Sequence, residues 1–213
     1  MALTKADVAG GGTGAASLTD HGVVLGSGTG AVSVTAAGTS GQVLTSGGSG
    51  ADPAWAAAIT EVDSWRLSAS FTTDGSFQYF TSNLERDDSQ GFGKPGTGMT
   101  QSSGVFTFPS TGYWRVSHHT YITWNGTTGS STQYLMHTAN GAAGSPTWVA
   151  AASPGGLGVS GKGGSTASES IFLITDLANH KITFATITQS GGSIVGATDR
   201  NYTYMTFTRL APE

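Results

Sequence analysis

The sequence lacks cysteine and is poor in charged residues. None of the 213 residues is a cysteine, and only 10% are Asp, Glu, Lys or Arg. Disulfide frameworks and thiolate metal sites are therefore excluded, which agrees with assembly in a reducing cytoplasm. The nine Lys and Arg residues form no cluster and the net charge is −4, whereas binding to nucleic acid requires a basic stripe. We expect no nucleic-acid partner.

Long hydrophobic runs and helical periodicity are also missing. No apolar run approaches the ~20 residues of a membrane-spanning helix, and the first residues, MALTKADVAGGGTG, do not resemble a secretion signal. We therefore expect no membrane insertion. Glycine is abundant instead, with 33 residues, or about twice its usual share. Many glycines with few charges favour a rigid β-structure with tight turns over a disordered chain.

Residues 1–58 differ from the rest of the chain in composition. They are mostly Gly, Ala, Ser, Thr and Val, and the segment Val24–Ala31 returns in similar form as Val43–Ala51. Each copy places a β-type pair before a Gly/Ser turn, and one copy cannot bury its few apolar side chains alone. A flexible Gly/Ser linker is the alternative, but a linker does not need regularly placed Val and Leu. We predict a structured β-repeat.

The order of short motifs in this region carries a resemblance. GGTGA, LTD followed by HG, LGSGTGA and GQVLTSGG succeed one another between residues 11 and 48. The region resembles the stalk repeats of bacteriophage fibre and appendage proteins. That resemblance implies a shaft in which three chains wind together, with residues 1–58 as the stalk and the region that attaches to the virion.

Residues 59–213 contain short strand patterns separated by turn clusters, at the spacing of a β-sandwich. The predicted strands are 65–71, 77–81, 105–108, 113–124, 132–138, 147–152, 170–175, 181–188 and 202–210. The predicted fold class is therefore all-β: a Gly/Ser/Thr/Val-rich β-stalk followed by a two-sheet jelly-roll head over residues 59–213.

The longest of these patterns, residues 113–124, is predicted to be the central strand. Aromatic and β-branched residues alternate along it, and its even-numbered positions from Trp114 to Trp124 are expected to face the core. The preceding turn and this strand contain a set of spaced residues: Gly104, Phe106, Thr107, Pro109, Gly112, Trp114 and Val116. This pattern resembles the signature of complement-component-one-q-like and tumour-necrosis-factor-like heads. That resemblance implies a trimeric jelly roll.

The last predicted strand has apolar residues on both faces. Thr203, Met205 and Phe207 lie on one face, with Tyr202, Tyr204 and Leu210 on the other. A strand of a β-sandwich normally has one face exposed to solvent, so the apolar residues on the second face predict contact with a neighbouring subunit. In the resembled family this strand belongs to the sheet that lines a three-fold axis. Tyr202, Tyr204 and Leu210 are therefore candidates for a homotrimer interface.

Few motifs suggest chemistry. Gly156–Gly161 followed by Lys162 fits a phosphate-binding loop only if a helix follows, whereas the sequence predicts a strand. Glu85, Asp87 and Asp88 are the only gathered carboxylates, and they are compatible with a solvated turn or with a weak calcium site. His119 in three symmetry copies could ring an axis around a metal, although a satisfied core or interface histidine is the favoured interpretation. We expect no cofactor.

Together these patterns predict a bacteriophage virion protein that is not an enzyme. It would be a trimeric fibre or spike, bound to other virion proteins through residues 1–58 and to a host glycan or protein through its head. The resemblance implies that the last strand ends at the base, beside the stalk, and counting strands back from it places three loops at the outer tip, at residues 125–131, 153–166 and 189–201. The candidate receptor contacts are Trp124, Asn125, Thr127, Lys162, Asp199 and Arg200. The alternatives are a capsid decoration protein and, less favoured, a capsular-polysaccharide depolymerase.

Overall fold

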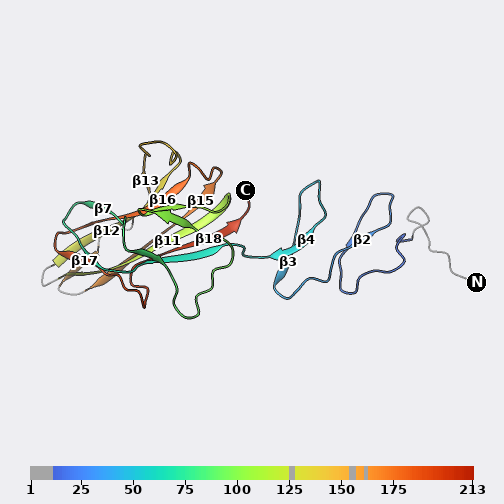
Figure 1. Cartoon of the computed structure of the whole chain (residues 1–213), viewed down its shortest axis with the longest axis horizontal. Helices are drawn as coiled ribbons and strands as arrows, with labels where there is room; N and C mark the ends of the chain where they lie inside the picture. The colour runs from blue at the N-terminus through green and yellow to red at the C-terminus, as the bar shows by residue number, and fades with distance from the viewer. Residues whose placement is uncertain (1–11, 125–127, 154–156, 161–162) are drawn as a thin grey trace, which may run out of the picture. The chain divides into compact units, whose positions relative to one another are not determined.

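The computed structural model describes residues 12–124, 128–153, 157–160 and 163–213. Strands are the regular elements of these ranges, which contain no helix long and apolar enough to cross a membrane (Figure 1). The protein is therefore all-β, as predicted. The chain divides into two compact units, Met1–Ala58 and Ile59–Glu213, which are described separately.

The N-terminal unit contains two short antiparallel hairpins. β1 (Val24–Leu25) pairs with β2 (Ser33–Val34), and β3 (Gln42–Thr45) pairs with β4 (Ala54–Ala57). Each copy of the sequence repeat thus supplies the first strand and the turn of one hairpin. The segment has the structured form that its regularly placed Val and Leu residues indicated.

Trp55 joins the two hairpins. Its indole Nε1 donates to the carbonyl oxygen of Ala36 at 2.8 Å and to Oγ1 of Thr35 at 3.2 Å. Thr35 Oγ1 also accepts from the backbone N–H of Val23 at 3.0 Å. A groove of about 600 Å³ lies along this side of the unit, with Trp55 among its lining residues.

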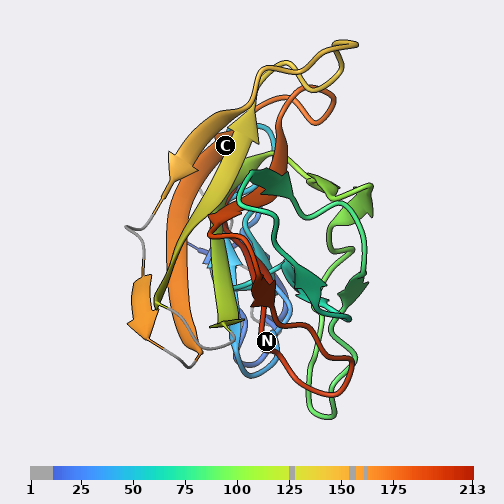
Figure 2. The ribbon, with the colours of Figure 1, turned by 90° about the vertical axis from the view of Figure 1, so that its left-hand side faces the viewer.

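The C-terminal unit is a sandwich of two antiparallel sheets, named here after their central strands (Figures 1 and 2). The β11 sheet contains β5 (Val62–Leu67), β6 (Phe71–Thr72), β8 (Leu84–Arg86), β11 (Gly112–Trp124), β15 (Gly164–Ile174), β17 (Gly192–Ile194) and β18 (Tyr204–Ala211). The β16 sheet contains β7 (Phe77–Tyr79), β9 (Thr100–Ser102), β10 (Val105–Thr107), β12 (Thr128–Thr138), β13 (Val149–Ala152), β14 (Leu157–Ser160) and β16 (Lys181–Thr188). This is the predicted two-sheet jelly roll.

β11 is the central strand of its sheet, as its sequence pattern predicted. It pairs with β15 on one side and with β18 and then β17 on the other, giving the main order β5-β18-β11-β15. Its even-numbered side chains from Trp114 to Trp124 are all buried. Period-two alternation places them together on the inner face.

Two glycines of the turn signature occupy positions that a larger residue would strain. Gly104 has a φ of 79°, and a Cβ there would collide with the carbonyl oxygen of Phe80. Gly112 has a φ of 126°, and a Cβ there would collide with the carbonyl oxygen of Ala211. Both backbones therefore require glycine, because L-residues rarely adopt these angles.

The core lies between the inner faces of the two sheets and is rich in phenylalanine. Phe106 is its centre: its ring lies 5.5 Å from that of Phe184, 5.1 Å from that of Phe207 and 5.5 Å from that of Trp65. The remaining buried members come from both sheets. A continuous core of this kind is what a domain of this size needs to fold.

Some strands are longer than the sequence predicted, and four strands were not predicted at all. β12 begins at Thr128 rather than at residue 132, β15 begins at Gly164 rather than at 170, and β8, β9, β14 and β17 were not predicted. The added ends of β12 and β15 are mostly Gly, Ser and Thr, and they show no apolar alternation. Their hydroxyls turn inward instead, as at Ser131, Thr166 and Ser168, which are buried.

Candidate functional site

The strand ends that flank the connections predicted to form the outer tip lie at one end of the sandwich. Ile122 pairs with Gly164 and with Ile194, and Ser131 pairs with Thr188, so these strand ends meet. Much of the expected loop surface, however, is strand. Thr128–Ser131 pair with β14, and residues 164–166 belong to β15. The tip therefore has less loop than the strand count suggested.

The candidate receptor residues that the structure describes do not form one surface. Trp124 is only 5% exposed and belongs to the core, so its assignment as a receptor contact is wrong. Its indole is buried because Trp124 falls on the inward-facing register of β11. Asn125, Thr127 and Lys162 lie outside the described residues. Asp199 and Arg200 are exposed but bind each other at 2.7 Å, with Arg200 over the Tyr202 ring at 5.8 Å.

The outer face of the β11 sheet carries a row of aromatic side chains. Tyr204 stacks on His119, with ring centroids 5.0 Å apart, and Tyr202 stacks on Tyr121 at 5.6 Å. All four side chains are half-buried within the protomer. On the opposite face of this segment Thr203, Met205 and Phe207 are buried. The predicted two-sided character of the last strand is therefore present in the structure.

Exposed aliphatic and aromatic side chains continue this outer face beyond the stacked pairs. Tyr113, Ile171 and Leu173 are 44%, 60% and 42% exposed, and Leu210 is 48% exposed. Tyr113 pairs with Leu173 across β11 and β15, and its neighbour Arg115 pairs with Ile171. The face thus presents apolar surface at the end opposite the tip, where polar side chains would be expected on a monomer.

The two adjacent histidines of β11 have opposite environments. His119 lies on the outer face, where its Nδ1 is 3.1 Å from the carbonyl oxygen of Tyr202. His118 points into the core, packs against Phe80 and Phe184, and bonds Thr120 Oγ1 through Nε2 at 2.9 Å. Burial lowers the pKa of His118 to about 3, with a further lowering from His119, so the imidazole is neutral at physiological pH.

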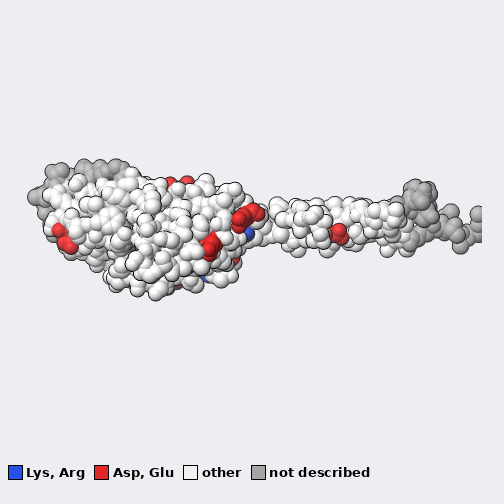
Figure 3. All heavy atoms as spheres, turned by 90° about the horizontal axis from the view of Figure 1, so that it is seen from above, with Lys and Arg blue, Asp and Glu red and all other residues white. Residues whose placement is uncertain are grey.

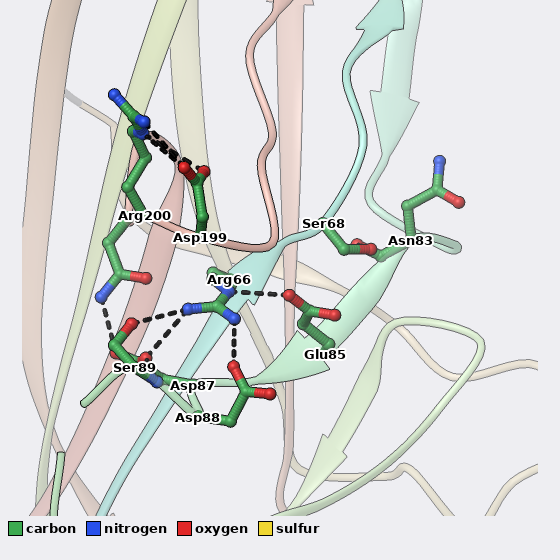
Figure 4. A network of polar contacts seen from close by, with 10 residues as sticks. Arg66, Ser68, Asn83, Glu85, Asp87, Asp88, Ser89, Asp199 and Arg200 are labelled. Carbon is green, nitrogen blue, oxygen red and sulfur yellow. Dashed lines mark hydrogen bonds and ion pairs between the residues drawn. The ribbon is translucent and has the colours of Figure 1, made fainter.

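The acidic cluster surrounds a buried guanidinium, shown in Figure 4. Arg66 is fully buried, and its Nε donates to Glu85 at 2.7 Å. One terminal nitrogen donates to Asp87 at 3.1 Å and to Ser89 at 2.7 Å, and the other donates to Asp88. The arrangement is neither the solvated turn nor the calcium site considered from the sequence. The Arg66 charge takes the central position that a cation would occupy.

Asp87 is the buried carboxylate of this network. Although burial alone would raise its pKa, hydrogen bonds from Ser89 and Asn201 and the charge of Arg66 hold the pKa below its usual value. Asn201 donates to Asp87 at 2.6 Å, which ties the β17–β18 connection to the network. A buried ion group of this kind fixes the position of loops rather than performing chemistry. In the described ranges no three His, Asp or Glu side chains are arranged to hold a metal ion.

The glycine-rich motif at Gly156–Gly161 has the wrong surroundings for a phosphate site. Leu157–Ser160 form β14, and the chain resumes as β15 from Gly164. Gly156, Gly161 and Lys162 lie outside the described residues. Because a strand follows instead of a helix, the N-terminal helix dipole that binds phosphate is not supplied.

The outer face of the β16 sheet holds an aromatic cluster that the sequence did not indicate. The Phe77 ring lies 5.1 Å from the Tyr79 ring and 5.1 Å from the Tyr134 ring. Beside Tyr79 is a pocket of about 170 Å³. It is lined by Tyr79, Thr81, Ser103, Val105, Trp148 and Thr183. The sequence signals were the alternation of Phe77 and Tyr79 and the strand predicted at residues 147–152, which contains Trp148, but neither indicated that the two segments share a pocket.

No protein-family model matches the chain, and no curated protein matches it. Solved structures with a similar fold include Eiger TNF from S. frugiperda, 10% identical, covering 73% of this chain and 95% of that one at a TM-score of 0.48. Murine APRIL is 11% identical, with 70% and 98% covered and a TM-score of 0.47. PRD1 vertex protein P5 is 17% identical, with 72% and 99% covered and a TM-score of 0.42. At these identities the likeness concerns the fold alone.

Proposed function

We propose that the protein is a homotrimeric structural component of a bacteriophage virion, a fibre or spike whose jelly-roll head attaches to the host surface. In this proposal residues 1–58 join the head to other virion proteins. The observation that carries the proposal is the apolar surface left exposed on both units of a single chain. A trimer would bury that surface in each unit, as a closed symmetric assembly does.

The N-terminal unit supports assembly because its hairpins leave apolar side chains uncovered. Val24, Val43 and Leu44 are 52%, 45% and 40% exposed, although they are the residues that repeat. A two-stranded hairpin is only marginally stable in water. Three copies wound together would pair these side chains, which also agrees with the resemblance of this region to fibre stalks.

The outer face of the β11 sheet supports assembly of the head. Its half-buried rings, Tyr202 and Tyr204 among them, and the exposed Ile171 and Leu173 present a broad apolar surface. Charged groups on this face include the ion pair between Arg115 and Glu169 at 2.6 Å. They also include Arg66, opposite Tyr204, which binds Glu85 at 2.7 Å. A neutralised pair within an apolar face is compatible with an interface, whereas isolated charges would oppose one.

Sedimentation of the purified full chain tests the trimer. We expect three protomers, and Tyr204→Glu should dissociate them because an unpaired carboxylate in an interface costs several kcal/mol. Leu210→Glu is a second variant, since Leu210 is exposed in the protomer and its replacement leaves folding intact. Val149→Glu, on the β16 sheet, is the matched control. A stable monomer at micromolar concentration contradicts the proposal.

The role in the virion is tested on intact particles. Antibody labelling of the head in electron micrographs should decorate an external appendage, and free head should compete with particles for adsorption to the host. The surface of the protein agrees with an external structural role: few charged side chains appear on the face displayed in Figure 3. Normal adsorption by particles that lack the protein would contradict attachment.

Capsid decoration is the alternative function, and the small loop surface at the tip supports it. Trp124 is buried, and all three expected loops are partly strand, so the tip offers less variable surface for a receptor. Labelling on the capsid shell together with normal adsorption of particles that lack the protein would support decoration.

We further propose that the protein is not an enzyme. The three gathered carboxylates bind Arg66, and Asp63 binds Arg86 at 2.9 Å, which supports structural roles for these acids. Release of reducing sugar from host capsule by the purified chain would overturn this proposal and revive the depolymerase alternative.

A further inference from the structure

The pocket on the outer face of the β16 sheet has two aromatic walls. Tyr79, 40% exposed, comes from β7, and Trp148 comes from the connection that precedes β13. Thr183 of β16 is buried at the base, where its hydroxyl donates to the carbonyl oxygen of Gly104 at 2.9 Å. The base of the pocket is therefore held in place by this hydrogen bond. The Phe77 and Tyr134 rings extend the aromatic surface beyond Tyr79.

Hydroxyl groups accompany the aromatic walls. Thr81 and Ser103 both line the pocket and are exposed, so their hydroxyls are open to a ligand. Ser103 has a φ of 50°, and with Gly104 at 79° it makes a turn in which both central residues are left-handed. Such turns favour Asn or Gly, so a serine held there keeps a hydroxyl at the pocket despite its backbone preference.

The size and charge of the pocket restrict the ligand. Its volume of about 170 Å³ is well below the roughly 300 to 1,000 Å³ of sites for drug-sized ligands. All six lining residues are uncharged, so the pocket supplies no counter-ion for a phosphate, a sialic acid or a basic peptide. A small, neutral ligand with both C–H and O–H surfaces matches this lining.

We propose that this pocket binds one neutral hexose unit of a polysaccharide. The C–H face of a pyranose ring packs on the electron-rich face of an aromatic side chain, here Tyr79 or Trp148. Its hydroxyls then exchange hydrogen bonds with Thr81 and Ser103. The Phe77 and Tyr134 rings would carry a neighbouring sugar of the chain. This deepens the proposed host attachment and rests on it for biological meaning, but it moves the contact from the tip to a sheet face.

The test is titration of the full chain with methyl glucoside, methyl galactoside and methyl mannoside, followed by saturation-transfer NMR. We expect saturable binding of at least one hexoside with a Kd in the millimolar range. Trp148→Ala should weaken hexoside binding about tenfold or more. We also expect hexoside binding to change the fluorescence of Trp148. Trp148→Phe should retain hexoside binding but abolish this fluorescence change. Val149→Ser, the exposed neighbour, is the control and should bind as the parent does.

Two further measurements address charge and folding. Methyl glucuronide, the anionic counterpart, should bind more weakly than methyl glucoside. Ser103→Gly relieves the left-handed backbone and so folds normally, yet it should weaken hexoside binding because the hydroxyl is lost. Failure of all three hexosides to bind, full binding by Trp148→Ala, or equal binding of the glucuronide would each overturn the proposal.

Particles that carry Trp148→Ala separate this inference from the proposed function. If the soluble chain binds a hexoside through Trp148 but particles lacking the head adsorb normally, the sugar site stands and host attachment falls. If adsorption requires the head but is unchanged by Trp148→Ala, attachment stands and its receptor contact lies elsewhere, which overturns the link between the pocket and attachment.

Discussion

The two units of the chain differ in how far they bury their apolar side chains. The C-terminal unit closes two sheets over a core in which Phe106, Phe184 and Phe207 are fully buried. In the N-terminal unit, described residues 12–58 form β-hairpins without a second layer, and the repeating Val24 and Val43 stay about half exposed. The same secondary structure therefore stands alone in one unit and is incomplete in the other. Apolar area removed from water, rather than strand content, separates them.

Separating the units should give the largest effect. We expect residues 59–213 to fold and to unfold cooperatively on heating, because the whole core belongs to this unit. Residues 1–58 alone should lack stable structure as a monomer, since two-stranded hairpins are marginal in water. Circular dichroism and sedimentation of the two fragments, with the full chain as reference, measure this. A folded monomer of residues 1–58 would show that the hairpins need no neighbour.

The Arg66 network should give the next largest effect, confined to the C-terminal unit. Arg66→Ala leaves the buried Asp87 carboxylate without its partner and should destabilise the unit by about 3–5 kcal/mol. Denaturant unfolding of the head measures it. Arg200→Ala removes an exposed ion pair with Asp199 and is the matched control, expected to leave the midpoint nearly unchanged. Equal effects of the two changes would mean that burial of Arg66 is not decisive.

Acid should weaken the C-terminal unit through His118. Its folded-state pKa of about 3 lies below the ordinary value of about 6.5, so the unfolded chain binds the proton first as pH falls. This stability is fully present above about pH 6.5 and is lost at roughly 1.4 kcal/mol per pH unit down to about pH 3. His137 acts in the same direction, because burial and His180 lower its pKa.

His118→Phe isolates this contribution, because it keeps a ring against Phe80 and Phe184 but cannot titrate. We expect a shallower loss of stability between about pH 6.5 and 4 than in the parent, with His137 accounting for the remainder. His21→Gln, in the N-terminal unit, is the control and should leave the pH profile of head unfolding unaltered. An unchanged slope in His118→Phe would argue against a neutral buried imidazole.

The comparison also explains which features the sequence predicted. The fold class, the inward face of β11 and the two-sided last strand follow from period-two alternation, which is local and strong. Long-range charge pairing is not local: Arg66 meets Asp87 only because β5 and β8 are neighbours, so the acidic cluster was interpreted without its partner. Trp124 was misassigned because its place beside a loop was weighed above its own strand register. The pocket beside Trp148 depends on long-range contacts between segments that are far apart in the sequence, which local alternation does not predict.

The smallest expected effect is that of Val43→Ser in the N-terminal unit. It shows whether Val43 is exposed to solvent in the assembled protein or covered by a neighbouring chain. Val43→Ser removes an apolar group from a hairpin of the N-terminal unit, where the side chain is 45% exposed. If the chain were a monomer, the change should alter stability by no more than about 0.5 kcal/mol, as surface substitutions usually do. In a trimer the side chain becomes buried, and the loss should approach about 1 kcal/mol for each chain. Thermal unfolding of the full chain, monitored in the N-terminal unit through Trp55 fluorescence, measures the difference, and Ser46→Ala in the adjoining turn is the control. A loss no larger than that of the control would place Val43 in water in the assembled protein and would remove the hairpins from the proposed interface.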